Sequence, residues 1–276
     1  MRLNILFLLL TAVFFTVNAN AADTADLTVD QIVAKANHVA YYQALDGKSR
    51  VAMTITDKQG RTRSREFVIL RKNSDDKDSD QSYFVYFLAP SDVRKMVFMV
   101  QKHAAVDKDD DRWLYLPNLD LVKRIASTDK RTSFVGSDFL YEDVSGRSLD
   151  EDTHTLVETT ESSYIIRNTP KNPDSVEFSY FNVTIDKKNL MPMKMEYYDK
   201  SGTLYRTIES KKVEDITAKE GEKEVTYPTV TESVVKDLKT GSTTEMTFSN
   251  VSYNIGVEDA IFTERYLRRP PREAMR

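Results

Sequence analysis

Few residues of this 276-residue sequence have the types and spacing that catalysis requires. It contains no cysteine, which excludes disulfides, thiolate zinc sites and a cysteine nucleophile. The three histidines are His38, His103 and His154, and none belongs to a catalytic motif. Gly136-Ser137-Asp138 lacks the Gly-x-Ser-x-Gly spacing of a hydrolase nucleophile elbow. We therefore predict no catalytic residue and a non-enzymatic protein.

The acidic residues give no convincing metal site. Asp107, Asp109 and Asp111 alternate as at the start of a calcium loop, but the sixth position is Arg112 and the twelfth is Asn118. Such a loop needs Gly and Glu there, so we predict a solvated turn and no metal. The eight glycines form no phosphate-binding loop, which predicts no cofactor. With 39 Lys and Arg against 43 Asp and Glu, nucleic acid is not an expected partner.

Aromatic residues around the segment 111–143 are the most distinctive feature. Some belong to strand-like stretches, whereas Phe134, Phe139 and Tyr141 lie among Gly, Ser and acidic residues. Large aromatic side chains on an irregular segment need an apolar space, and the inside of a curved sheet supplies one. A segment that plugs the core is an equally good interpretation, because both arrangements use the same residues. The candidate cavity or lid residues are Phe84, Tyr86, Phe98, Trp113, Tyr115, Phe134, Phe139 and Tyr141.

Two groups of charged residues are further candidates. The first would hold the aromatic segment in place or contact a ligand headgroup, and comprises Arg124, Asp138, Glu142 and Asp143. A buried ion pair between Arg124 and one of these acids is an alternative of equal weight. The second would contact an acidic partner, although a solvated basic tail is favoured. It comprises Arg265, Arg268, Arg269, Arg272 and Arg276.

The elements that must position these residues are mainly β-strands. Thr28-Val29-Asp30-Gln31 matches a capping box, and apolar residues at helical spacing follow it, with Gly47 as a stop. From Ser49 onward hydrophobic residues alternate with a period of two, and turn residues divide the chain into about eleven strands. The stretch 83–88 is apolar on both faces and is expected to be a central strand. We predict one antiparallel sheet curled into a barrel or half-barrel, with a last helical turn at 262–267.

The first 21 residues have the pattern of a secretory signal peptide. Met1-Arg2 is a short positive region, Leu3–Val17 is mostly apolar, and Ala19-Asn20-Ala21 is a cleavage pattern. We therefore expect cleavage near Ala21/Ala22 and a single domain, 22–276, in the periplasm. An uncleaved anchor helix is less favoured because the apolar stretch is short.

Three motifs resemble the signature of a bacterial family described as outer-membrane lipoprotein-sorting proteins, in the superfamily of the carrier LolA and the receptor LolB. They are Trp113-Leu114-Tyr115-Leu116-Pro117, Lys123-Arg124-Ile125 and the stretch from Ser133 to Asp143. The resemblance covers most of the predicted mature chain. It implies an incomplete antiparallel β-barrel whose concave apolar face is covered by helices and holds acyl chains. It also implies an association with inner-membrane transporters of the resistance-nodulation-division type.

Together these features favour a periplasmic carrier or chaperone for lipid or lipoprotein acyl chains, which supports sorting to the outer membrane and contacts membranes only transiently. Met53, Met96 and Met99 are candidates for an adaptable lining. The missing cysteine makes the chain resemble the mobile carrier rather than the anchored receptor. The alternative is an interaction or sensor module for a transporter or regulator, with lipid only as a signal. A hydrolase acting on envelope material ranks third.

Overall fold

The computed structural model describes residues 27–105 and 108–275, so the predicted signal peptide lies outside the described residues. Its main element is one antiparallel sheet of thirteen strands, compared with the expected eleven or so. The strands are β1 (Asp46–Thr56), β2 (Thr62–Asn73), β3 (Gln81–Ala89), β4 (Val97–Lys102), β5 (Asp111–Leu116), β6 (Leu121–Ile125), β7 (Asp152–Thr159), β8 (Ser163–Pro170), β9 (Phe178–Asp186), β10 (Pro192–Asp199), β11 (Leu204–Glu220), β12 (Lys223–Asp237) and β13 (Ser242–Tyr253).

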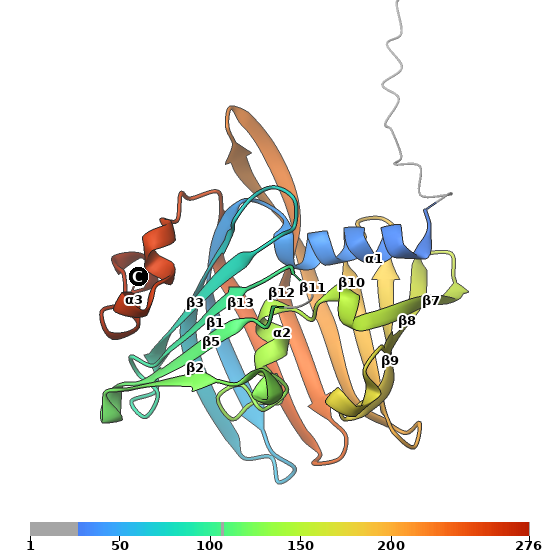
Figure 1. The fold of residues 1–276 in the computed structure, drawn as a ribbon, viewed down its shortest axis with the longest axis horizontal. Helices are drawn as coiled ribbons and strands as arrows, with labels where there is room; N and C mark the ends of the chain where they lie inside the picture. Colours follow the sequence, from blue (N-terminus) through green and yellow to red (C-terminus); the bar gives the residue numbers. More distant parts are fainter. Residues whose placement is uncertain (1–26, 106–107, 276) are drawn as a thin grey trace, which may run out of the picture.

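The order of the strands explains how the sheet curves without closing. It is β6-β5-β4-β3-β2-β1-β13-β12-β11-β10-β9-β8-β7, so β6 and β7 are the two edges. The chain builds one half outward from β1, crosses to the opposite edge and returns to pair β13 with β1. The connection between the two edges, residues 126–151, is called the crossover below. It passes over the inner, concave face of the sheet (Figure 1), and this confirms the prediction of an incomplete barrel.

Helices cover the concave face, as expected. Helix α1 (Val29–Asn37) begins at the predicted capping box, where the backbone N–H groups of Thr28 and Gln31 donate to each other's side chains at 2.9 and 3.3 Å. Its buried residues pack in one apolar cluster with β8, β9 and β10, and the helix continues as the π-helix η1 (His38–Tyr42). The crossover contributes the short helix α2 (Tyr141–Ser145), flanked by the single-turn helices η3 (Ser127–Asp129) and η4 (Leu149–Glu151).

Other helical turns lie outside the concave face. The C-terminal segment contains η6 (Asp259–Phe262), α3 (Glu264–Arg268) and η7 (Arg272–Ala274), close to the predicted helical turn. It packs on the opposite, outer face of β2 to β5, which explains why β3 is buried on both sides. The remaining turns are η2 (Pro117–Leu119) and η5 (Pro173–Ser175). Within residues 27–105 and 108–275, no helix has the length and apolar character needed to cross a membrane.

Candidate functional site

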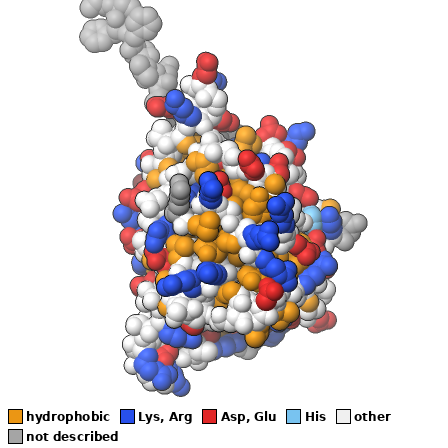
Figure 2. Space-filling model, turned by 90° about the vertical axis from the view of Figure 1, so that its left-hand side faces the viewer, with side chains coloured by type: hydrophobic (Ala, Val, Ile, Leu, Met, Phe, Trp, Pro, Cys, Tyr) orange, Lys and Arg blue, Asp and Glu red, His pale blue; other side chains and the backbone are white. Residues whose placement is uncertain are grey.

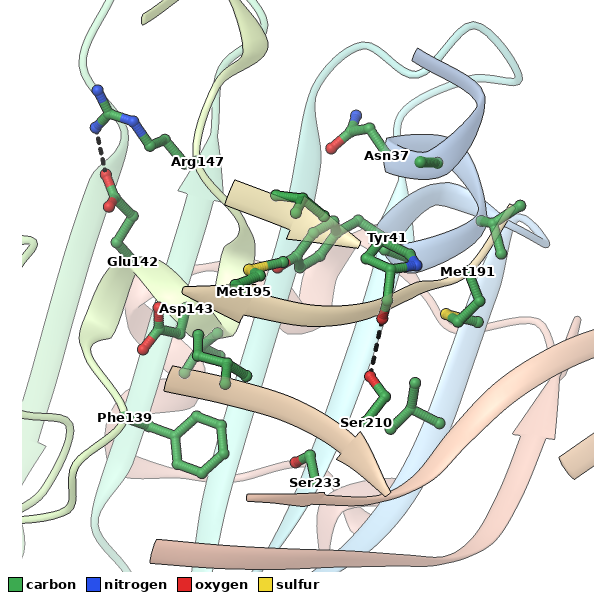
Figure 3. A pocket seen from close by; sticks show the side chains of 18 of the residues that line it. Asn37, Tyr41, Phe139, Glu142, Asp143, Arg147, Met191, Met195, Ser210 and Ser233 are labelled. Atoms are coloured by element: carbon green, nitrogen blue, oxygen red, sulfur yellow. Dashed lines mark hydrogen bonds and ion pairs between the residues drawn. The ribbon is translucent and has the colours of Figure 1, made fainter. Parts of the chain in front are cut away.

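A cavity of about 370 Å³ lies between the concave face of the sheet, helix α1 with η1, and the crossover. Its size falls in the range of small-molecule binding sites. Figure 3 shows Phe139, Glu142 and Asp143 on the crossover side, and Met191, Met195 and Ser210 on the opposite wall. Most of the wall is apolar, including Val33, Ile69, Ile166, Val183, Ile185, Met195, Ile208 and Phe248. Because these residues come from both halves of the sheet, the cavity exists only when the sheet curves.

The aromatic residues of the crossover fill one half of the barrel and border the cavity with the same side chains. Phe134 is fully buried, and its ring centroid lies 5.5 Å from that of Phe98 and 5.7 Å from that of Tyr141. Phe134 and Phe139 also line the cavity. The two interpretations left open by the sequence, a plug and a lid, therefore describe neighbouring parts of one structure. Whether Phe98, Phe134, Phe139 and Tyr141 contact a ligand stays a prediction.

The other four aromatic candidates lie on the opposite side of the sheet. Phe84, Tyr86, Trp113 and Tyr115 belong to the outer cluster, which is covered by the C-terminal segment. The cavity-lining role expected for these four is therefore wrong. The reason is the alternation of side chains along a strand, because Phe84 and Phe87 must point to opposite faces. In a strand buried on both faces, hydrophobicity does not distinguish the inner side.

The crossover is held down by a buried network of ion pairs around Glu142. The Glu142 side chain is only 3% exposed and contacts three cations: Arg131, Arg147 at 3.2 Å and Lys130 at 3.3 Å. Burial alone would raise the pKa of the Glu142 carboxyl, but the three cations outweigh it and hold that pKa below its ordinary value. Glu142 is therefore a buried carboxylate whose charge depends on its neighbours.

The same network ties the crossover to the sheet. Arg131 makes a bidentate pair with Glu177, just before β9, at 2.6 and 2.8 Å, and its guanidinium lies 4.7 Å from the centroid of the Phe178 ring. Burial raises the pKa of Glu177, yet hydrogen bonding from Arg131 brings it down to about 2. Arg147 pairs with Asp152 at the start of β7 at 2.8 Å. Ion pairs thus attach the crossover to the starts of two strands, β7 and β9.

Asp143 and Asp138 attach the crossover to two further strands, β11 and β13. Asp143 forms an ion pair with Arg206 of β11 and accepts a hydrogen bond from the backbone N–H of Leu140 at 2.7 Å. Asp138 accepts hydrogen bonds from the hydroxyls of Ser242 and Thr244 on β13, the latter at 2.7 Å. These contacts link the crossover to β11 and β13, and whether Asp138 and Asp143 also contact a ligand headgroup stays a prediction.

Arg124 does not pair with any of these acids. Its side chain is 69% exposed, pairs with Asp111 and lies 5.9 Å from the centroid of the Trp113 ring. The alternative of a buried ion pair between Arg124 and a signature acid is therefore wrong. Arg124 lies opposite Trp113 in the register of β5 and β6, and the two side chains share the outer face. The cations that pair with Glu142 and Asp143 are Lys130, Arg131, Arg147 and Arg206, and no sequence pattern indicated them.

Comparison with known proteins agrees with this architecture. A family model with the description of an uncharacterized protein matches residues 79–269, more than half of the chain. The chain belongs to this family. A solved DUF1329 family protein from Desulfovibrio piger is 28% identical, with 86% of this chain and 96% of that chain covered and a TM-score of 0.75. None of the curated proteins matches the chain.

Two further solved structures share the fold. A proposed outer membrane lipoprotein-sorting protein domain from Vibrio parahaemolyticus is 24% identical, covering 87% of this chain and 96% of that chain with a TM-score of 0.72. A LolA superfamily protein from Nitrosomonas europaea is 18% identical, covering 87% and 100% with a TM-score of 0.64. The LolA-like fold predicted from the sequence is therefore confirmed.

The residues that match the family include the whole crossover. Asp138, Glu142 and Asp143 lie within residues 79–269, as do their partners Arg131 and Arg206. The three histidines instead have separate partners: Asp78 for His38, Asp80 for His103 and Asn168 for His154. No cluster of three possible metal-ligating side chains occurs in the part of the chain that the structure describes.

Proposed function

We propose that this protein is a periplasmic carrier or chaperone that holds lipid or lipoprotein acyl chains and supports their sorting to the outer membrane. The observation that carries the proposal is the apolar cavity of about 370 Å³ beneath the crossover. The fold shared with a LolA superfamily protein supports it. The periplasmic location rests on the predicted signal peptide. A resistance-nodulation-division-type transporter of the inner membrane is the proposed partner, on the strength of the family resemblance.

The chemistry of the walls suits an acyl chain. Each methylene moved from water into an apolar site contributes about 0.8 kcal/mol, so an acyl chain of ordinary length contributes about 10 kcal/mol before ordering costs. Adaptable side chains are present, although not those expected. Met191, Met195 and Met246 line the cavity, whereas Met53 is in the core beside it and Met99 is in the outer cluster. Flexible thioethers can follow chains of different shape.

We propose that the crossover moves when the ligand is released. The crossover, which forms the roof of the cavity, is held by the ion pairs and hydrogen bonds of Asp138, Glu142 and Asp143 and by its buried aromatic rings. Such contacts are lost together when a segment lifts, and they form again when it closes. Binding and release need only a cavity and a movable roof, so we propose a non-enzymatic role with no cofactor.

Purification of the full chain followed by lipid extraction and mass spectrometry tests whether it carries lipid. A fluorescent fatty acid then locates the site. Ile208→Trp fills the cavity from β11, so we expect it to weaken binding at least about tenfold, the effect of losing contacts to two methylenes. Thr207→Trp is the matched control, because neighbouring residues of a strand face opposite sides.

Equal binding by both tryptophan variants and the wild type would place the fatty acid outside this cavity. The absence of both extracted lipid and fatty-acid binding would refute the carrier proposal. It would favour the interaction or sensor module instead.

A further inference from the structure

One outer surface of the molecule combines apolar and basic side chains. Figure 2 shows it from the side that carries α3 and the β5–β6 end of the sheet, with apolar side chains in the middle and Lys and Arg around them. We call this surface the docking face and define it by six residues. They are Trp113, Tyr115, Leu119, Leu121, Arg124 and Arg268.

The tip of the β5–β6 hairpin exposes leucine to solvent. Leu119 is 71% exposed, the highest value among the large apolar side chains that the structure describes, and Leu121 is 47% exposed. Water-exposed leucines next to each other on a projecting turn gain free energy when they enter an apolar phase. The hairpin core does not need them, because β5 and β6 are already paired over five residue pairs.

Two aromatic rings beside this tip each lie close to a guanidinium group. The Arg124 guanidinium lies 5.9 Å from the centroid of the Trp113 ring, and that of Arg268 lies 5.9 Å from the centroid of the Tyr115 ring. Trp and Tyr favour the boundary between lipid headgroups and acyl chains, and Arg reaches from such a boundary to phosphate. Arg268 Nε also donates to Asp120 at 3.0 Å, so the C-terminal segment and the hairpin form one continuous surface.

The charge of this surface differs from that of the whole chain. Residues 111–125 and 264–275 contain seven Lys and Arg and four Asp and Glu, a net charge of +3, whereas the whole chain carries −4. A basic rim around exposed leucines is complementary to a membrane of anionic phospholipids. The anionic lipid, rather than an acidic protein, is favoured because the exposed leucines project from a turn beside the basic side chains.

We propose that the docking face binds reversibly to the surface of an anionic phospholipid membrane, with Leu119 and Leu121 entering the acyl boundary. This surface lies outside the cavity and gives the protein a membrane-binding site of its own. It is also continuous with the roof, because β6 ends at Ile125 and the crossover begins at the next residue. A membrane bound at the hairpin therefore contacts β6, the strand that leads directly into the crossover.

The test is sedimentation of the full chain with vesicles of phosphatidylcholine mixed with phosphatidylglycerol, or of phosphatidylcholine alone. We expect partition to be at least about tenfold higher onto the anionic vesicles and to fall with added salt. Replacing both leucines, Leu119→Asn with Leu121→Asn, should lower partition at least about tenfold. Leu238→Asn is the matched control, because Leu238 is 51% exposed on the β12–β13 turn, away from the docking face.

A second variant, Arg124→Gln with Arg268→Gln, removes two basic groups without touching the leucines and should lower the preference for anionic vesicles. Equal binding to both vesicle types, or equal losses in the leucine variant and in Leu238→Asn, would overturn the proposal. So would a lack of vesicle binding by the wild type, even if the fatty acid still binds the cavity. Vesicle binding without fatty-acid binding would instead refute the carrier function and leave the docking face intact.

Discussion

Removal of the arginine at the centre of the ion-pair network should destabilise the protein strongly. Arg131→Met deletes the contacts to Glu142 and Glu177 but keeps most of the apolar stem over Phe178. Removing one partner of a buried pair costs about 3–5 kcal/mol. Glu142 keeps Arg147 and Lys130, and Glu177 is 44% exposed and can be hydrated again, so we expect the lower end, about 3 kcal/mol.

Thermal and urea unfolding followed by circular dichroism measure this change. For a chain of this size about 3 kcal/mol corresponds to a melting temperature lower by about 6–12 °C. Lys212→Met is the control, since it breaks an ion pair with Glu214 whose side chains are both about half exposed, and it should leave the melting temperature unchanged. A loss below about 1 kcal/mol in Arg131→Met would show that the network does not hold the crossover.

The pH dependence of the same variant provides an independent check. The folded-state pKa values of Glu142 and Glu177 lie below their ordinary values, that of Glu177 at about 2. Their stabilising effect is therefore complete above the unfolded pKa and is lost as the pH falls through the folded pKa. The wild type should lose stability between about pH 5 and pH 2, and the difference from Arg131→Met should shrink over that window. A difference that stays constant with pH would refute the reasoning.

Three other changes should give distinct results. Asp143→Asn leaves Arg206, whose side chain is 5% exposed, without its charged partner, so we expect a loss of about 3 kcal/mol in urea unfolding and faster release of a bound fluorescent fatty acid in stopped flow. Phe134→Ala removes a fully buried ring from the aromatic plug and should cost about 3–5 kcal/mol, while an unchanged melting temperature would contradict that packing. Thr28→Ala removes the N-cap of α1 and should lower the free energy of unfolding by about 1 kcal/mol in urea, whereas the conservative control Thr28→Ser should keep the cap.

Features that depend on neighbouring residues were predictable from the sequence. The capping box at Thr28 and Gln31 involves residues three apart, and it was found where expected. The strands follow a two-residue period that reports burial locally, and β3 was correctly predicted to be central. The prediction of a curved, open sheet came from the family resemblance as well as from the strand pattern.

The sequence did not predict which face of the sheet a side chain points to, or which residues distant in the sequence contact each other. Phe84 and Phe134 are equally hydrophobic, yet one is under the C-terminal segment and the other is in the plug. No local property separates them, because both faces of this half of the sheet are covered.

The same limit applies to charge. The sequence alone determined a mainly β chain with an amphipathic first helix, and a segment of aromatic and acidic residues that needs burial. Only the tertiary structure decided that Glu142 pairs with Arg131 and Asp143 with Arg206, rather than either with Arg124. Among 39 basic and 43 acidic residues, sequence distance does not select partners. The curvature of the sheet selects them, because it brings β9 and β11 beneath the crossover and excludes the water that would otherwise screen every pair alike.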